Sequence, residues 1–276
     1  MDISMTRPFT IGVIISTNNN PRWLEKTLWG YALQTHKPNE VIIADDGSTD
    51  DTKKVVDSFR NLLPINHIWQ EDRGFRKSEI LNKALVAAKS DYLIFTDQDC
   101  IPRNDFVEVH YKNAREKCYI SGGYFKLTMG VSLAITINDI AHGDAFDINW
   151  LISKGQPIST KMTKLQNVDW FAKFMNFITP AEPTWNGCNS SGWRTDLLAV
   201  NGFNEDMQYG GQDREFGYRL QNNGIKPIQL RFSAICVHLD HKRPYKTKET
   251  LAFNRNVMLK TRKNRVIKTP NGIVKL

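Results

Sequence analysis

Residues 41–48 read Val-Ile-Ile-Ala-Asp-Asp-Gly-Ser, an apolar run that stops at two carboxylates and a turn. A short, continuous apolar run of this kind predicts a strand that is buried on both faces, as in parallel sheets. Either Ser48 or Asp50 can cap a following helix, whose apolar positions include Val56 and Phe59. The stretch therefore predicts a strand, a turn and a helix in that order.

The same succession of elements recurs on both sides of this stretch. Residues 10–16 predict an earlier strand, and after the break at residues 18–21 apolar side chains return at helical spacing. Further along, the patterns predict a strand over 65–69, a helix over 78–88 and a strand over 92–96. Strands that alternate with helices predict an α/β fold with a Rossmann-like, doubly wound and mostly parallel sheet.

Polar side chains gather where these predicted strands end. In doubly wound sheets, ligands bind beyond the carboxyl ends of the strands, so residues at those ends are candidates for a binding site. An Asp-Gly-Ser turn is common for structural reasons alone, but three such clusters at successive strand ends favour a site. The candidates are Ser16, Thr17, Asp45, Asp46, Asp97 and Asp99.

Asp97 and Asp99 form an Asp-x-Asp motif at the end of the last of these strands. Side chains two apart in an extended segment project to the same side, which leaves Gln98 pointing away from the two carboxylates. Paired carboxylates suit a hard divalent cation such as Mg²⁺ or Mn²⁺, which leaves coordination positions open for substrate phosphates. The alternative is an exposed acidic turn with no ion.

Length and composition exclude several other classes. A chain of 276 residues can bury a large core without staples, and its four widely spaced cysteines, without a Cys-x-x-Cys pair, predict free thiols rather than disulfides or a zinc site. No apolar run approaches the roughly 20 residues of a membrane-spanning helix, and the first residues lack the pattern of a signal peptide. We therefore expect a cytoplasmic protein.

The formal charge of +8 is concentrated near the C-terminus. Such a basic stretch attracts anions, among them anionic lipid headgroups, nucleic acid or a diphosphate-bearing substrate, and a solvated basic tail is the alternative. We expect peripheral contact with the inner face of an anionic membrane, or with a polyanionic acceptor, rather than with nucleic acid, because no nucleic-acid recognition motif is present. The basic residues are Lys242, Arg243, Lys246, Lys248, Arg255, Lys260, Arg262, Lys263, Arg265 and Lys268.

Taken together, these motifs resemble the family 2 glycosyltransferases of the GT-A fold. The resemblance rests on residues 14–17, the Ala-Asp-Asp-Gly-Ser-Thr-Asp block at 44–50, the motif at 97–99 and a C-terminal block within 185–241. That block is similar to the acceptor regions of chondroitin-polymerase-type transferases and β-1,4-galactosyltransferases. The resemblance implies a nucleotide-sugar-binding half at 1–120, an acceptor-binding and catalytic half at 121–241, and a basic tail at 242–276.

The same resemblance implies roles for particular residues. A UDP-sugar donor would be contacted by Ser16, Thr17, Asp45, Asp46, Arg73, Arg76 and Asp97, with Arg73 or Arg76 near the diphosphate. A Mn²⁺ or Mg²⁺ ion would be held by Asp97, Asp99 and His238, with His241 as the alternative to His238. A lone histidine is more often structural, so this ligand stays open between the two.

Asp213 is the candidate catalytic base. It opens a helix predicted over 213–223, where the helix dipole favours the carboxylate anion, so it can accept a proton from an acceptor hydroxyl. The alternative role is a plain helix N-cap. Gln212 stands where the family usually has Glu, and this puts any acceptor contact made by that Glu in doubt.

The sequence thus predicts an inverting hexosyltransferase that moves a hexose or N-acetylhexosamine from a UDP-sugar to a saccharide or glycolipid acceptor. Two other classes share part of the pattern. A nucleotidyltransferase would usually carry a Gly-rich phosphate loop with a Lys, where this chain has three asparagines at 18–20. A non-catalytic nucleotide-sugar-binding protein would have no use for a base at Asp213.

Overall fold

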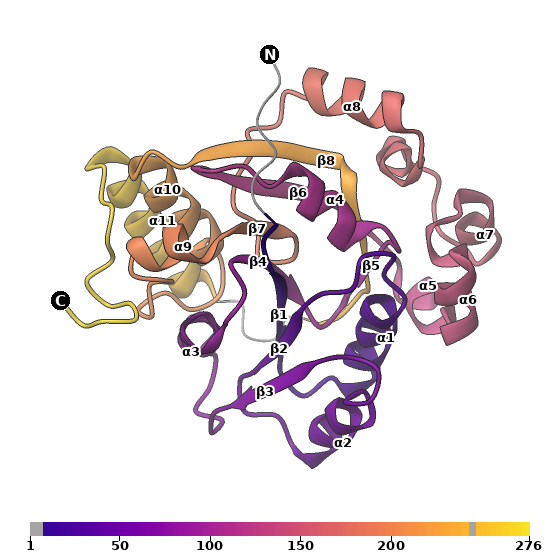
Figure 1. The fold of residues 1–276 in the computed structure, drawn as a ribbon, viewed down its shortest axis with the longest axis horizontal. Helices are drawn as coiled ribbons and strands as arrows, with labels where there is room; N and C mark the ends of the chain where they lie inside the picture. The colour runs from indigo at the N-terminus through magenta and orange to yellow at the C-terminus, as the bar shows by residue number, and fades with distance from the viewer. Residues whose placement is uncertain (1–7, 243–246) are drawn as a thin grey trace.

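An eight-stranded sheet runs through the protein in the order β3-β2-β1-β4-β7-β6-β8-β5 (Figure 1). The computed structural model describes residues 8–242 and 247–276. The strands are β1 (Ile11–Thr17), β2 (Glu40–Asp45), β3 (Ile65–Trp69), β4 (Tyr92–Asp97), β5 (Cys100–Pro102), β6 (Cys118–Lys126), β7 (Ser190–Trp193) and β8 (Lys226–His238).

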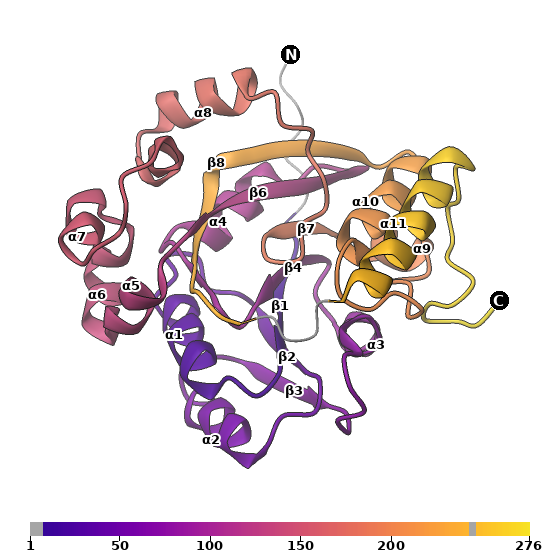
Figure 2. The same ribbon diagram turned by 180° about the vertical axis from the view of Figure 1, so that it is seen from behind.

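Helices cover the sheet on both faces. The described α-helices are α1 (Pro21–Ala32), α2 (Asp50–Ser58), α3 (Lys77–Ala87), α4 (Phe106–Asn113), α5 (Met129–Ala134), α6 (Ile137–His142), α7 (Ile148–Ser153), α8 (Asp169–Ile178), α9 (Arg194–Ala199), α10 (Gln212–Asn222) and α11 (Lys248–Lys263). In Figures 1 and 2, α9, α10 and α11 pack together on one side of the molecule, and α1 and α2 lie on the other. None of the helices in these described ranges combines the length and apolarity that crossing a bilayer demands.

The first half of the sheet is parallel, as the sequence predicts. β1 lies between β2 and β4, and all seven of its residues are buried. The register aligns Ser16 with Asp97 and Thr17 with Asp45, so the polar residues that follow three strands meet at one edge.

The second half of the sheet is mixed. β7 runs antiparallel to both β4 and β6, whereas β6 and β8 are parallel to each other. The short strand β5 pairs antiparallel with the end of β8 and aligns Cys100 with His238. This pairing places a residue from late in the chain beside the Asp-x-Asp motif, which no local pattern could predict.

Two expectations about helix caps need correction. The helix α2 takes Thr49 as its N-cap rather than Ser48 or Asp50. The helix α10 begins at Gln212 with Gly211 at the N-cap, where φ is 94°, so Asp213 lies inside the first turn and is not the cap.

The expected basic tail is a folded part of the protein. Within the described residues, Thr247 caps α11, and this helix packs along α10. The buried Asn254 side chain of α11 donates hydrogen bonds to the backbone carbonyls of Gln208, Tyr209 and Gly210. Arg243 and Lys246 of the basic stretch lie outside the described residues.

Candidate active site

A cleft of about 1120 Å³ opens at the carboxyl ends of β1 and β4 and extends to α10 and α11. Most of the candidate site residues line it: Ser16, Thr17, Asp46, Asp97, Asp99, Asp213, His238 and His241. Asp45, Arg73 and Arg76 are not among its described lining residues. The cleft therefore brings the Asp-x-Asp motif, both candidate histidines and the candidate base together.

The floor of the cleft is formed by the ends of β1 and β4. The Ser16 hydroxyl donates to Asp97 Oδ1 at 2.6 Å, and the Thr17 hydroxyl donates to the side-chain oxygen of Gln98. Asn18 follows and donates from its side chain to the backbone carbonyl of Asp46 at 2.7 Å. These bonds fix the two strand ends relative to each other.

Asp45 and Asp46 occupy different environments although they are neighbours. The Asp46 carboxylate accepts from Gln70 Nε2 at 2.6 Å and from the Arg76 backbone N–H at 2.8 Å, and burial raises the pKa of this group. Asp45 lies behind the cleft, where its carboxylate accepts from the Ser48 backbone N–H and contacts His67 Nε2 at 2.9 Å. Asp45 therefore shapes the turn, and Asp46 is the one that faces the cleft.

The two arginines are engaged elsewhere. Arg73 makes two hydrogen bonds to the exposed carboxylate of Glu71, and Arg76 pairs with Glu79 at 3.0 Å. Lys77 does line the cleft, and its Nζ lies 2.5 Å from Asp97 Oδ1. Burial alone would lower the pKa of Lys77, but the carboxylates of Asp97, Asp213 and Asp99 raise it above its ordinary value.

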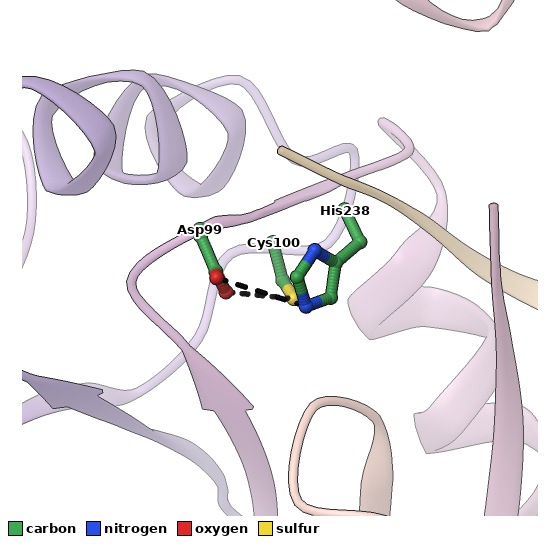
Figure 3. A group of neighbouring side chains, drawn as sticks. All are labelled: Asp99, Cys100 and His238. Carbon is green, nitrogen blue, oxygen red and sulfur yellow. Dashed lines mark hydrogen bonds and ion pairs between the residues drawn. The ribbon is translucent and has the colours of Figure 1, made fainter. Parts of the chain in front are cut away.

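Asp99 faces two histidines at the opposite wall (Figure 3 shows Asp99, Cys100 and His238). Its Oδ2 lies 3.6 Å from His238 Nε2 and 2.9 Å from His241 Nε2. In each histidine, Nδ1 bonds to a backbone carbonyl at 2.8 Å, that of Leu239 or that of Lys242. Burial alone would raise the pKa of Asp99, but the two histidines, when protonated, lower it to about 2.

This arrangement fits a divalent cation. A histidine whose Nδ1–H is held by a backbone carbonyl presents the lone pair of Nε2, the form in which imidazole binds metals. Both such lone pairs and an ionised carboxylate converge here, which favours a cation between them. Cys100 is the third neighbour of Asp99 and His238, but burial raises the pKa of its thiol, and a protonated thiol is a poor ligand for a hard ion.

Asp213 lies across the cleft in the first turn of α10. Its Oδ1 is buried and has no hydrogen-bond partner among the described residues. A Cβ at Gly187 would lie 2.7 Å from both carboxylate oxygens, so only glycine leaves them room there. Burial raises the pKa of Asp213 to about 6, with Lys77 opposing this effect and Asp97 adding to it. A carboxylate with a pKa near neutrality is suited to act as a general base.

The polar neighbours of Asp213 in α10 make structural contacts of their own. The Gln212 side chain folds back and accepts from the Gly210 backbone N–H at 2.8 Å. Further along α10, Glu215 forms a fully buried ion pair with Arg219 at 2.9 Å and accepts a hydrogen bond from Thr261 of α11. Gln212 and Glu215 are therefore committed to structure, and Asp213 is the carboxylate of this block that faces the cleft.

Lys77 is a cleft residue that none of the sequence motifs predicts. It is the first residue of α3 and lies in a charged stretch, where a lysine is usually expected to be exposed to solvent. Its meeting with Asp97 depends on how α3 packs against the sheet, for which the local sequence carries no signal.

Comparison with known proteins decides the family. Residues 12–148 match the family described as "Glycosyl transferase family 2", and residues 173–242 match "N-terminal domain of galactosyltransferase". This chain belongs to the family 2 glycosyltransferases. The second match confirms the galactosyltransferase-like character of the C-terminal block.

This glycosyltransferase has curated relatives of greater length. It is 28% identical over 255 residues to validoxylamine A glucosyltransferase of Streptomyces hygroscopicus subsp. limoneus, covering 85% of this chain and 52% of the relative. It is 28% identical over 231 residues to chondroitin synthase of Escherichia coli, covering 78% of this chain and 32% of the relative. The chain thus spans about half the length of the first relative and a third of the second.

Solved structures confirm the GT-A fold. S. aureus TarS 1-349 in complex with UDP-GlcNAc aligns with a TM-score of 0.59 at 17% identity and covers 85% of this glycosyltransferase and 59% of that chain. The mannosyltransferase PcManGT from Pyrobaculum calidifontis, in complex with GDP-Man and Mn²⁺, aligns with a TM-score of 0.57 at 21% identity, covering 87% and 59%.

Proposed function

We propose that this glycosyltransferase moves a hexose or N-acetylhexosamine from a UDP-sugar to a hydroxyl of a saccharide or glycolipid acceptor, with inversion at the anomeric carbon. The observation that carries the proposal is the carboxylate of Asp213, whose buried Oδ1 has no partner in the described part of the chain and which shares one cleft with Asp97, Asp99 and His238. A protein that only bound the donor would gain nothing from a carboxylate held at this pKa. The chondroitin synthase relative supports a place in polysaccharide or lipopolysaccharide-type glycan synthesis.

Donor binding is assigned to the end of the cleft formed by β1, β2 and β4. Ser16, Thr17 and Asp46 are the groups there that can bond to uracil and ribose. Asp45 supports them through the turn, and Lys77 takes the place next to the diphosphate that the resemblance implies for Arg73 and Arg76. UDP is the proposed nucleotide because the aligned TarS structure is a complex with UDP-GlcNAc and because the motifs at 14–17, 44–50 and 97–99 resemble those of enzymes that use UDP-sugars. A GDP-sugar, as in the PcManGT complex, is the competitor to test.

The divalent ion is assigned to Asp99 and His238, with His241 and Asp97 beside them. Mn²⁺ is favoured over Mg²⁺ because imidazole nitrogen is among the donors, and Mg²⁺ prefers oxygen ligands. When bound, the ion would neutralise negative charge on the diphosphate. The PcManGT complex with Mn²⁺ supports this choice.

The chain's own residues then carry out a single displacement. Asp213 accepts the proton of the acceptor hydroxyl while that oxygen forms its bond to the anomeric carbon. The bond from the anomeric carbon to the diphosphate oxygen breaks on the opposite face, and UDP leaves with the electron pair. Lys77 offers positive charge on the side of the leaving group, and such fixed charge is usually a large part of catalysis.

A two-step experiment tests the proposal. A thermal-shift screen of UDP- and GDP-sugars with Mn²⁺ identifies the donor, because a ligand that binds only the native state stabilises it. UDP release is then measured with that donor and a panel of saccharide acceptors, and the anomeric configuration of the product is read by NMR. Acceptor-dependent UDP release with an inverted product is expected. Retention of configuration, or donor binding with turnover that is unaffected by Asp213→Asn, would contradict it.

A further inference from the structure

Charged residues of both signs line the cleft. Four carboxylates line the donor end: Asp46, Asp72, Asp97 and Asp99. The basic lining residues are Lys77, Lys126, Lys242, Arg214 and Arg255. Lys77 pairs with Asp97 and Lys126 is aligned with His238, whereas Arg214 follows Asp213 in α10. The two arginines lie in the half of the cleft that contains Asp213, where the acceptor would enter.

Arg255 reaches the cleft because of the way α11 packs. Leu251, Arg255 and Met258 recur at helical spacing, and all three line the cleft. This face of α11 lies against the Gly210-Gly211 turn that precedes α10, since a Cβ at Gly211 would lie 3.9 Å from Met258 Sδ. Arg255 is therefore held near the start of α10, where Asp213 is located.

Both arginines are exposed, and neither has an ion-pair partner among the described residues. Two other arginines of the same region do have carboxylate partners. Arg219 is buried against Glu215, and Arg262 lies 3.7 Å from Glu182 outside the cleft. Uncompensated guanidinium groups at the wall of a cleft raise the local concentration of anions and match phosphate and carboxylate oxygens in geometry.

The donor does not account for these two residues. Its diphosphate belongs near Asp99, His238 and Lys77, and the bases that flank that cluster are Lys126, which is paired in register with His238, and Lys242. Arg214 follows Asp213 directly in α10, and Arg255 comes from the neighbouring helix. Positive charge at these positions therefore lies beside Asp213, where the acceptor hydroxyl is deprotonated in the proposed reaction.

We propose that the acceptor carries an anionic group, a phosphate or a carboxylate, which Arg214 and Arg255 bind while its hydroxyl meets Asp213. This inference rests on the proposed function, because it assumes that Asp213 marks the acceptor side. It narrows the acceptor from any saccharide or glycolipid to an acidic one.

Binding to the protein loaded with UDP and Mn²⁺ tests the inference. Isothermal titration compares three matched probes: methyl β-glucoside, its 6-phosphate and methyl β-glucuronide. We expect one of the two anionic probes to bind at least about tenfold more tightly than the neutral one, with a preference that salt weakens. The phosphate and carboxylate arms identify which anion the site takes.

Two variants of α11 locate the preference. Arg255→Glu should abolish the preference for the anionic probe, and Arg255→Gln should reduce it. The Gln variant provides the test if the charge reversal unfolds the protein. Lys260→Glu is the matched control, since it makes the same charge change at an exposed position of the same helix that does not line the cleft. Equal binding of all three probes, or a preference that survives in both Arg255 variants, would overturn the inference. Failure of the proposed function would appear separately, as a protein that binds no UDP.

Discussion

Replacing Asp213 with asparagine should slow sugar transfer and at the same time stabilise the folded protein. The pKa of this carboxyl is about 6 in the folded protein, against an ordinary value of 3.8. Each pKa unit corresponds to about 1.4 kcal/mol, so ionising Asp213 at neutral pH costs the folded state about 3 kcal/mol at most. The amide that replaces the carboxyl carries no charge, and the variant avoids this cost.

The pH dependence of the effect has a definite sign. Below the unfolded pKa, Asp213 is protonated in both states, so the stability associated with its raised pKa is fully present and the variant gains nothing. As pH rises through the folded pKa of about 6, the wild type loses this stability and the variant does not. For a domain of this size, about 3 kcal/mol corresponds to a melting temperature higher by roughly 6 °C.

Calorimetry at about pH 4, 5, 6 and 7 spans this titration, and Asp50→Asn supplies the control. Asp50 lies in the first turn of α2 at an exposed position. The same substitution there reports the helix-dipole effect without burial. A gain that is equal at the two ends of the pH range, or equal in the two variants, would mean that the Asp213 carboxyl is not perturbed by its site.

The same variant should lose catalysis. Transfer is expected to fall by roughly 10²- to 10⁴-fold, the range usually lost with a general base, while UDP affinity and its metal dependence stay near wild type. Glu215 should not substitute for Asp213, because it is buried in its ion pair with Arg219. Near-normal turnover of Asp213→Asn with a verified acceptor would place the base elsewhere.

Three further predictions concern the rest of the site and α11. Asp99→Ala should remove the enhancement of UDP binding by Mn²⁺, because the histidines lose the carboxylate that completes their cluster; equal titrations of wild type and variant would contradict the metal assignment. Lys77→Gln should move the acid limb of the kcat/KM profile to higher pH, because Lys77 lowers the pKa of Asp213; an unchanged limb would show that the two charges do not interact. The basic stretch 242–268 should bind anionic vesicles in low salt, each well-placed charge contributing about 1 kcal/mol, and equal sedimentation with neutral vesicles would leave it a solvated surface.

The donor end of the site can be predicted from sequence because its geometry is a property of parallel strands. The strands β1, β2 and β4 carry uninterrupted apolar runs, and the residue after each run must lie at the same edge of the sheet. Ser16 and Asp97 thus meet by register alone. The same logic identifies Asp46, although it cannot show that Asp45 turns the other way to contact His67.

The remaining parts depend on contacts between distant segments. The choice between His238 and His241 cannot be made from sequence, and the structure shows why: the pairing of β5 with β8 brings both imidazoles to Asp99. An arginine at 73 or 76 is expected beside the diphosphate because arginine suits phosphate, but local carboxylates hold both outside the cleft. Ion pairs between residues that are close in sequence, such as Arg76 and Glu79, can be anticipated from the sequence. The pairing of Lys77 with Asp97, which are 20 residues apart, cannot.

The net charge of the basic C-terminal stretch does not reveal that its residues lie on two different surfaces. As a block of charge it indicates one anion-binding tail, whereas as the helix α11 it has a face toward the cleft, with Arg255, and a face toward solvent, with Lys260 and Lys263. A helix places residues 255 and 260 about 140° apart, so a charge change at one leaves the other where it was. The proposed binding to an anionic membrane and the proposed binding to an anionic acceptor therefore depend on different residues. Reversal of charge at Lys260 and Lys263 should weaken only vesicle binding, and reversal at Arg255 should change the choice of acceptor.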